Sequence, residues 1–181
     1  MQEVSGPYRK VWSCESSVYM NHFVLAVDPG KTSGVAFLEW SGNADDNPIR
    51  KYSGELDADE FAPIIRQFLD SWKTYGYFQV VCERFIINAQ TVRNSQAPFS
   101  LEQIGVLKQL CRDNGYPVNG ITMQAPVDAK NMFPNPALKT LGTWHVGGEG
   151  HANDAIRHGL LHMVKARWVP KDLLQRKNTD T

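Results

Sequence analysis

The sequence lacks the features that mark a secreted or membrane-spanning protein. Only three cysteines occur in 181 residues, Cys14, Cys82 and Cys111. Their odd number and wide spacing match neither a zinc-binding pattern nor a disulfide framework. No apolar run approaches the length of a membrane span, and the first residues contain no apolar signal segment. We therefore expect a soluble protein of the reducing cytoplasm, in a bacterium or a phage-infected cell, with no membrane partner.

Net charge is also absent, because nineteen Lys and Arg residues balance nineteen Asp and Glu residues. Proteins that bind nucleic acids commonly carry an excess of basic residues, so the balance weakens that class without excluding it. The charges are unevenly distributed along the chain. Residues 28–60 hold eight acids and three bases, whereas residues 130–177 hold eight bases and three acids. A neutral total can therefore conceal a basic face.

Hydrophobic residues, 42% of the chain, are sufficient for one core. We expect one domain over residues 22–169, with a flexible extension at 1–21 and a charged tail at 170–181. Apolar periodicity, turn residues and caps predict its elements. In chain order these are antiparallel strands at 23–27, 34–39 and 50–56, a helix capped by Asp57 and reaching Tyr75, a strand at 78–82, a polar loop at 88–99, a helix capped by Ser100 and ending near Asn114, a strand at 121–124, an irregular segment at 131–150 and a helix at 151–168.

The segment that begins at Val24 is the most informative in the chain. Four apolar residues run into Asp28, the turn residues Pro29 and Gly30 follow, and a second apolar run begins after Gly34. This pattern predicts a buried strand that ends at Asp28, and a glycine at position 34 where two backbones approach closely. A hairpin in which Asp28 only caps the turn explains this segment alone equally well.

Two further acids lie at the ends of predicted elements. Glu83 follows the short apolar strand directly, and a carboxylate among apolar residues needs a partner or a metal ion. Asp154 lies in the first turn of the last helix, where the helix dipole favours an acid in any case. His151 precedes it by three residues on the same face. His158 and His162 continue that face, and we interpret them as solvated or core-edge residues.

The order and spacing of these motifs resemble the RuvC-type Holliday-junction resolvases of the ribonuclease H-like superfamily. The resemblance spans about residues 23–168 and suits a phage-type member. Many members have Asp where this chain has His151, and others have His. The motifs that carry it are Asp28-Pro29-Gly30, Glu83 with the loop to Gln90, Glu102 to Gly105, Pro126 to Lys130, and His151-x-x-Asp154. The resemblance implies an α/β fold, a ribonuclease H-like mixed five-stranded sheet flanked by helices.

The resemblance also implies an endonuclease that cleaves branched DNA as a homodimer, with two Mg²⁺ ions for which Mn²⁺ can substitute. Two such ions roughly 3.5–4 Å apart stabilise the attacking and leaving oxygens of a phosphodiester. Oxygen ligands suit Mg²⁺, so Asp28, Glu83 and Asp154 are the expected catalytic ligands. His151 is expected to bind metal or to orient the attacking water.

Four residues are predicted to contact the DNA. They are Lys130 and Arg93 as phosphate ligands, and Phe85 and Ile86 as apolar wedges into an opened junction. Phe85 and Ile86 fit ordinary core positions nearly as well.

Other functions compete with this interpretation. The segment Gly30-Lys31-Thr32 imitates the end of a phosphate-binding loop, but Leu25 stands where that motif requires a glycine. Actin-like ATPases and sugar kinases share the Asp-x-Gly turn, but they resemble two copies of this fold and the chain has room for one. Terminase-like or transposase-like nucleases, and a non-catalytic DNA-binding or scaffold protein, remain as alternatives.

Overall fold

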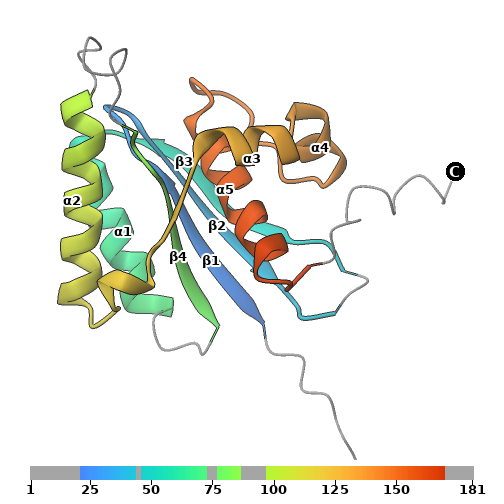
Figure 1. Ribbon diagram of the computed structural model, residues 1–181, viewed down its shortest axis with the longest axis horizontal. Coiled ribbons are helices and arrows are strands. Elements are labelled where there is room, and N and C mark those ends of the chain that lie inside the picture. The colour runs from blue at the N-terminus through green and yellow to red at the C-terminus, as the bar shows by residue number, and fades with distance from the viewer. Residues whose placement is uncertain (1–20, 44–45, 73–76, 87–96, 170–181) are drawn as a thin grey trace, which may run out of the picture.

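A mixed five-stranded sheet lies at the centre of the computed structural model (Figure 1), which describes residues 21–43, 46–72, 77–86 and 97–169. The predicted N-terminal extension and C-terminal tail lie outside these residues, apart from Asn21. The strands are β1 (His22–Asp28), β2 (Ser33–Trp40), β3 (Ile49–Leu56), β4 (Phe78–Glu83) and β5 (Thr122–Gln124). The helices are α1 (Ala58–Trp72), α2 (Ala97–Asp113), α3 (Pro126–Met132), α4 (Asn135–Thr140) and α5 (His151–Lys165), with a short 3₁₀ turn η2 (Val118–Gly120) before β5.

The strand order is β3-β2-β1-β4-β5, which places β1 in the middle of the sheet. The first three strands form the predicted antiparallel meander, while β4 pairs with β1, and β5 with β4, in parallel. Parallel strands need a crossover between them, and helices supply it here. The expected α/β fold with a mixed five-stranded sheet flanked by helices is therefore confirmed.

Helices cover both faces of the sheet (Figure 1). Side chains alternate along β1, because successive residues of a strand point to opposite faces. Val24 and Ala26 belong to the hydrophobic cluster that contains α5, whereas Leu25 and Val27 belong to the cluster that contains α1 and α2. The residues of both clusters are buried, and the middle strand is accordingly apolar from Phe23 to Val27, as the sequence suggested.

Prolines begin helices at three places, and two expectations are corrected for that reason. Ser100 does not cap α2: the helix begins at Ala97, and Ser100 is buried inside it. Segment 131–150 is not irregular throughout, because α3 ends within it and α4 follows. A proline suits the first turn of a helix, where its missing N–H has no intrahelical partner, and Pro98, Pro126 and Pro136 occupy such positions.

The remaining helix boundaries follow the sequence more closely. Asp57 caps α1, since its Oδ1 accepts hydrogen bonds from the backbone N–H groups of Asp59 and Glu60, both at 2.9 Å. The last helix begins at His151 as expected and ends at Lys165, three residues before the predicted end. In the part of the chain that the structure describes, every helix is too short or too polar to cross a membrane.

Gly34 is the point at which α5 contacts the sheet most closely. This residue lies in β2 opposite Asp28 of β1. A Cβ atom built on Gly34 would lie 1.9 Å from the carbonyl oxygen of His151 and 2.9 Å from the backbone nitrogen of Ala152. Both obstacles are backbone atoms, so no rotamer change relieves the clash. The absence of a side chain at position 34 therefore lets the first turn of α5 reach the end of β1.

We predict that Gly34→Ala destabilises the protein by about 1–3 kcal/mol, the usual cost of extra volume in a packed interior. The matched control is Gly105→Ala in α2, where an added Cβ meets no atom within 4 Å and a helical alanine gains about 0.5–1 kcal/mol over glycine. Urea unfolding followed by circular dichroism measures both. Equal stability of Gly34→Ala and wild type would contradict the close approach.

Candidate active site

The carboxylates of Asp28 and Glu83 lie at the same edge of the sheet, on the same face. Strands β1 and β4 are parallel neighbours, and their last paired residues are Val27 and Cys82. Each acid therefore comes one residue after the pairing ends. By alternation with Ala26 and Val81, which pack beneath α5, both acids point to the α5 side. The carboxyl ends of neighbouring parallel strands are where α/β proteins place their ligands.

Glu55 holds the beginning of α5 against this edge. Its carboxylate accepts hydrogen bonds from the backbone N–H groups of Glu149 and Gly150, both at 2.7 Å, and of Ala152 at 3.3 Å. Burial raises the pKa of Glu55, but these backbone hydrogen bonds outweigh it, and the pKa lies below its ordinary value. A carboxylate at a helix N-terminus satisfies N–H groups that lack intrahelical partners. Glu55 thus acts as a cap supplied by the edge strand.

With the start of α5 held in this position, the side chain of His151 contacts the carboxylate of Asp28. Nδ1 of His151 lies 2.9 Å from Oδ2 of Asp28. Burial raises the pKa of Asp28, and the charges of Glu83 and Asp154 raise it further, against the hydrogen bond from His151. The same hydrogen bond raises the pKa of His151. The three carboxylates are thus close enough for their charges to repel, with side chains only 9–20% exposed.

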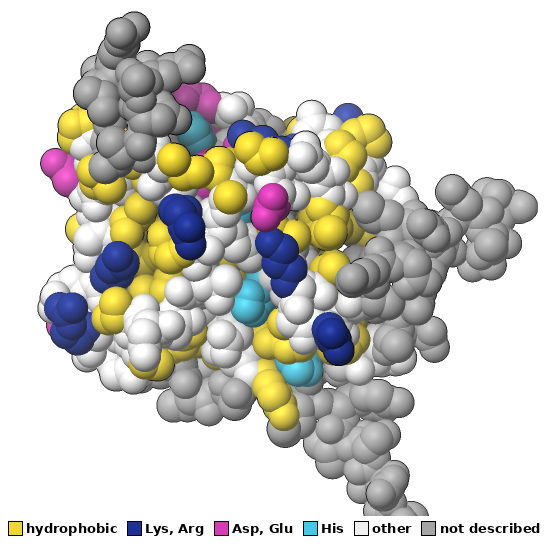
Figure 2. Space-filling model, in the orientation of Figure 1, with side chains coloured by type: hydrophobic (Ala, Val, Ile, Leu, Met, Phe, Trp, Pro, Cys, Tyr) yellow, Lys and Arg dark blue, Asp and Glu magenta, His cyan; other side chains and the backbone are white. Residues whose placement is uncertain are grey.

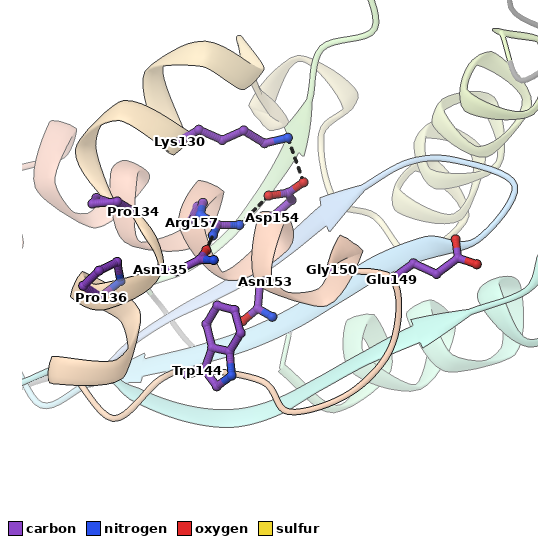
Figure 3. Close-up of a pocket in the computed structure, with 10 residues that line it drawn as sticks. All are labelled: Lys130, Pro134, Asn135, Pro136, Trp144, Glu149, Gly150, Asn153, Asp154 and Arg157. Carbon is purple, nitrogen blue, oxygen red and sulfur yellow. Dashed lines mark hydrogen bonds and ion pairs between the residues drawn. The ribbon is translucent and has the colours of Figure 1, made fainter.

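Two cations compensate the charge of Asp154 (Figure 3). Nζ of Lys130, from α3, lies 3.0 Å from Oδ2, and the guanidinium of Arg157, one turn along α5, donates to Oδ1. Arg157 is buried, and it also donates to the carbonyl of Phe133 and to the side-chain oxygen of Asn135. Burial lowers the pKa of Lys130, but the bond to Asp154 and the charges of Glu83 and Asp28 raise it above its ordinary value.

Glu83 is held by a histidine, which corrects the interpretation of His158 as a solvated or core-edge residue. His158 is 1% exposed. Its Nε2 lies 2.8 Å from Oε2 of Glu83, and its Nδ1 lies 3.0 Å from Oε1 of Gln124. Either the ring donates from both nitrogens, or the Gln124 amide turns over and donates to Nδ1. In both arrangements Nε2–H donates to Glu83.

His162, one turn further along α5, is partly buried, which agrees with the core-edge interpretation. Its side chain packs edge-on against Trp168, 5.3 Å between ring centroids, and burial lowers its pKa. Nε2 of His162 is buried, and it has no hydrogen-bond partner among the described residues. The two histidines thus lie on one helix, but only His158 contacts a carboxylate of the site.

A divalent metal ion fits the chemistry of this donor set. Within the described ranges, no three His, Cys, Asp or Glu side chains are already arranged as a metal-binding group. However, Asp28, Glu83 and Asp154 bring hard oxygen donors from three different elements to one place, where burial raises the pKa of Asp28 and the charges of Glu83 and Asp154 raise it further. Mg²⁺ prefers such oxygens and retains several waters. A bound cation would relieve the repulsion that His151, Lys130 and Arg157 now relieve in part.

The predicted DNA-contacting residues are dispersed. Lys130 lies at the carboxylates, as described above. Phe85 is partly buried and packs against the hydrophobic cluster of α1 and α2, which agrees with a core role, whereas the side chain of Ile86 is 47% exposed. Arg93 lies outside the described residues. The structure therefore gathers Lys130 with Asp28, Glu83, His151 and Asp154.

Sequence reasoning missed Glu55, Arg157 and His158. A signal for His158 was present: it follows Asp154 by four residues, so both side chains lie on one helical face. Arg157 follows Asp154 by three residues, a spacing at which ion pairs form on helices. Glu55 had no comparable signal, because its partners are backbone groups 94–97 residues later in the chain.

Comparison with known proteins supports the fold. No protein-family model and no curated protein match the chain. Among solved structures, Thermus thermophilus RuvC in complex with a Holliday junction substrate is similar, with 16% identity and a TM-score of 0.59 over 81% of this chain and 95% of that one. Another structure of T. thermophilus RuvC gives 16% identity and a TM-score of 0.60, over 80% and 95% of the two chains. At this identity the likeness shows the fold, and the chain therefore has the ribonuclease H-like fold of RuvC.

We predict that Glu55→Ala destabilises the protein by about 1–2 kcal/mol, because it leaves N–H groups at the start of α5 without an acceptor. Guanidinium unfolding measures the loss. Glu102→Ala, an exposed glutamate on α2, is the control and should change stability by less than about 0.5 kcal/mol. The same change in both variants would show that Glu55 is not a cap.

Proposed function

We propose that this chain is a divalent-metal-dependent endonuclease that cleaves phosphodiester bonds in branched DNA, with the four-way junction as its principal substrate. The observation that carries the proposal is the convergence of Asp28, Glu83 and Asp154 from two strands and a helix. Such a convergence is costly for stability, because it brings like charges into a poorly solvated place. It is also the donor set that phosphoryl chemistry with Mg²⁺ requires.

The residues divide the work as follows. Asp28, Glu83 and Asp154 hold Mg²⁺ or Mn²⁺, and when bound the ions supply an activated water and stabilisation of charge on the phosphate. His151, oriented by its hydrogen bond to Asp28, positions the attacking water. Nε2–H of His158 fixes the direction of the Glu83 carboxylate. With metal ions at Asp154, Lys130 would no longer be needed there for charge compensation and would be able to bind a non-bridging phosphate oxygen.

One observation favours branched DNA as the substrate, and a second favours DNA in general. A solved structure with this fold, T. thermophilus RuvC, is bound to a Holliday junction substrate. Lysine and arginine side chains are also spread over the face in Figure 2 that carries α3 and α5, although the net charge is zero. Phosphate contacts of this kind provide sequence-independent affinity. Arg93, Phe85 and Ile86 complete the proposed DNA contacts.

Resolving a four-way junction requires two cuts in opposite strands. The proposal therefore includes a homodimer that presents one set of carboxylates to each strand. We place this activity in the cytoplasm of a bacterium or a phage-infected cell. The second candidate is a nuclease of the same fold that acts on linear DNA, as terminases and transposases do; the carboxylates support it equally well, and the basic face does not distinguish it.

We predict that Asp28→Asn, Glu83→Gln and Asp154→Asn each reduce cleavage of a four-way junction at least about 100-fold, because each removes a metal ligand. Binding of the junction, measured by fluorescence anisotropy in Ca²⁺, should persist. Cleavage is followed on labelled junctions and on linear duplexes of the same sequence, with Mg²⁺ and with EDTA.

The control for charge is Glu102→Gln, an exposed site on α2, on the opposite side of the sheet from α5, which should cleave like wild type. Preferential cleavage of linear duplexes would contradict the four-way junction as the principal substrate and support the second candidate, a nuclease that acts on linear DNA. Near-wild-type cleavage by Asp28→Asn would exclude the carboxylates as the catalytic centre.

A second prediction concerns His158. His158→Ala should raise the Mg²⁺ concentration for half-maximal cleavage about 10–100-fold, the usual effect of removing a residue that orients a metal ligand. His158→Gln retains an N–H donor and should recover part of the loss.

His162→Ala is the matched control, because it removes a partly buried histidine of the same helix whose side chain contacts no carboxylate among the described residues. Both alanine variants should lower the melting temperature, but only the first should shift the Mg²⁺ requirement. An equal shift of the Mg²⁺ requirement in both variants would show that His158 contributes only to the stability of the protein.

A further inference from the structure

A cavity of about 610 Å³ opens beside Asp154, between α3 and α4 and the first turns of α5 (Figure 3). Lys130 and Asp154 both line it, so the cavity is continuous with the proposed active site. Its volume falls in the range of pockets that bind small organic groups, about 300–1,000 Å³. A DNA strand whose scissile phosphate lies at the carboxylates would thus have this cavity next to a neighbouring nucleotide.

One wall of the cavity is an aromatic ring supported by the core. Trp144 is partly buried and packs against the hydrophobic cluster beneath α5. Nζ of Lys139 lies 5.2 Å from the centroid of its ring. Pro134 and Pro136 add apolar surface to the lining. Aromatic rings fixed in this way are stacking platforms for nucleobases, and nearby lysines neutralise the adjacent phosphates.

The cavity also contains an oriented hydrogen-bond donor. Asn135 lines it, and the side-chain oxygen of Asn135 accepts a hydrogen bond from Arg157. A guanidinium group donates only, so the amide cannot turn over without losing this bond. The amide nitrogen of Asn135 therefore keeps its direction and, among the residues that the structure describes, remains available to donate to a ligand. Arg157 also donates a hydrogen bond to Asp154. The same guanidinium group therefore holds both Asn135 in the cavity and the Asp154 carboxylate.

We propose that this cavity receives one unstacked nucleobase from the cleaved strand, next to the scissile phosphate. The base stacks on Trp144 and accepts a hydrogen bond from Asn135, while Lys139 contacts its phosphate. The inference rests on the proposed function and adds a means of substrate choice. A base inside a continuous duplex cannot enter, because it must first leave the stack. Branch points and mismatches reduce that cost, so the cavity would favour DNA that is already distorted.

The test combines substitutions in the protein with deletions in the DNA. Junctions carry one abasic site in turn at each of the two nucleotides on either side of the scissile phosphate. Wild-type protein cleaves them in Mg²⁺, and kcat/KM is compared with that for the intact junction. We expect one abasic position to lower wild-type kcat/KM about ten-fold. In Trp144→Ala the same abasic site should change kcat/KM less than two-fold, and Trp144→Phe should restore the sensitivity.

Trp168→Ala is the control, because Trp168 is a partly buried tryptophan on the same hydrophobic cluster that does not line the cavity. This variant should keep the wild-type abasic profile. Asn135→Asp retains the acceptor for Arg157 and removes the donor. When junctions that differ only in the base at the sensitive position are compared, this variant should therefore cleave a different one of the four fastest.

The outcomes separate this inference from the proposed function. If wild type cleaves junctions but no abasic position affects it, or if Trp144→Ala keeps the wild-type profile, the base-binding role of the cavity is wrong and the nuclease proposal stands. An unchanged base preference in Asn135→Asp would overturn the contact between Asn135 and the base. If wild type cleaves no branched DNA, the proposed function fails and this inference fails with it.

Discussion

The close approach of α5 to the sheet at Gly34 is the constraint on which the rest of the site depends. The backbone of His151 occupies the space that any side chain at position 34 would need. Because Gly34 lies opposite Asp28, this approach brings His151 within hydrogen-bond distance of that carboxylate. Glu55 then holds the helix start in place through three backbone N–H groups. A glycine and a glutamate on adjacent strands thus determine where the functional side chains of α5 lie.

Charge compensation is the second organising feature. Each of the three carboxylates of the site has a nitrogen partner: His151 for Asp28, His158 for Glu83, and Lys130 with Arg157 for Asp154. Buried carboxylates without such partners would be costly. The partners differ in how firmly they are held, since Arg157 and His158 are buried whereas the side chain of Lys130 is 56% exposed. A bound cation would therefore displace the exposed ammonium group of Lys130 more readily than the buried Arg157 or His158.

The buried partners also extend the site beyond the carboxylates. Arg157 connects Asp154 to Asn135 and to the backbone of Phe133, and His158 connects Glu83 to Gln124 at the end of β5. The site is consequently supported by α3, α4, α5 and three strands. This explains how a short helix such as α4, which has few intrahelical hydrogen bonds of its own, is held next to the carboxylates.

The sequence by itself determined the strands, the last helix and the positions of Asp28, Glu83 and Asp154 at the ends of elements. These features follow from local patterns, because the alternation of apolar residues records burial and acids or turn residues record where a strand or helix ends. The start of α2 was misplaced and α4 was taken for an irregular segment, because proline in a first turn resembles a loop signal in isolation. The residues that contact Asp28, Glu83 and Glu55 were determined only by the tertiary structure. Asp28 and His151 are 123 residues apart, Glu83 and His158 are 75 apart, and Glu55 caps a helix 95 residues away. No local pattern encodes such contacts, since they arise when the sheet and α5 pack together.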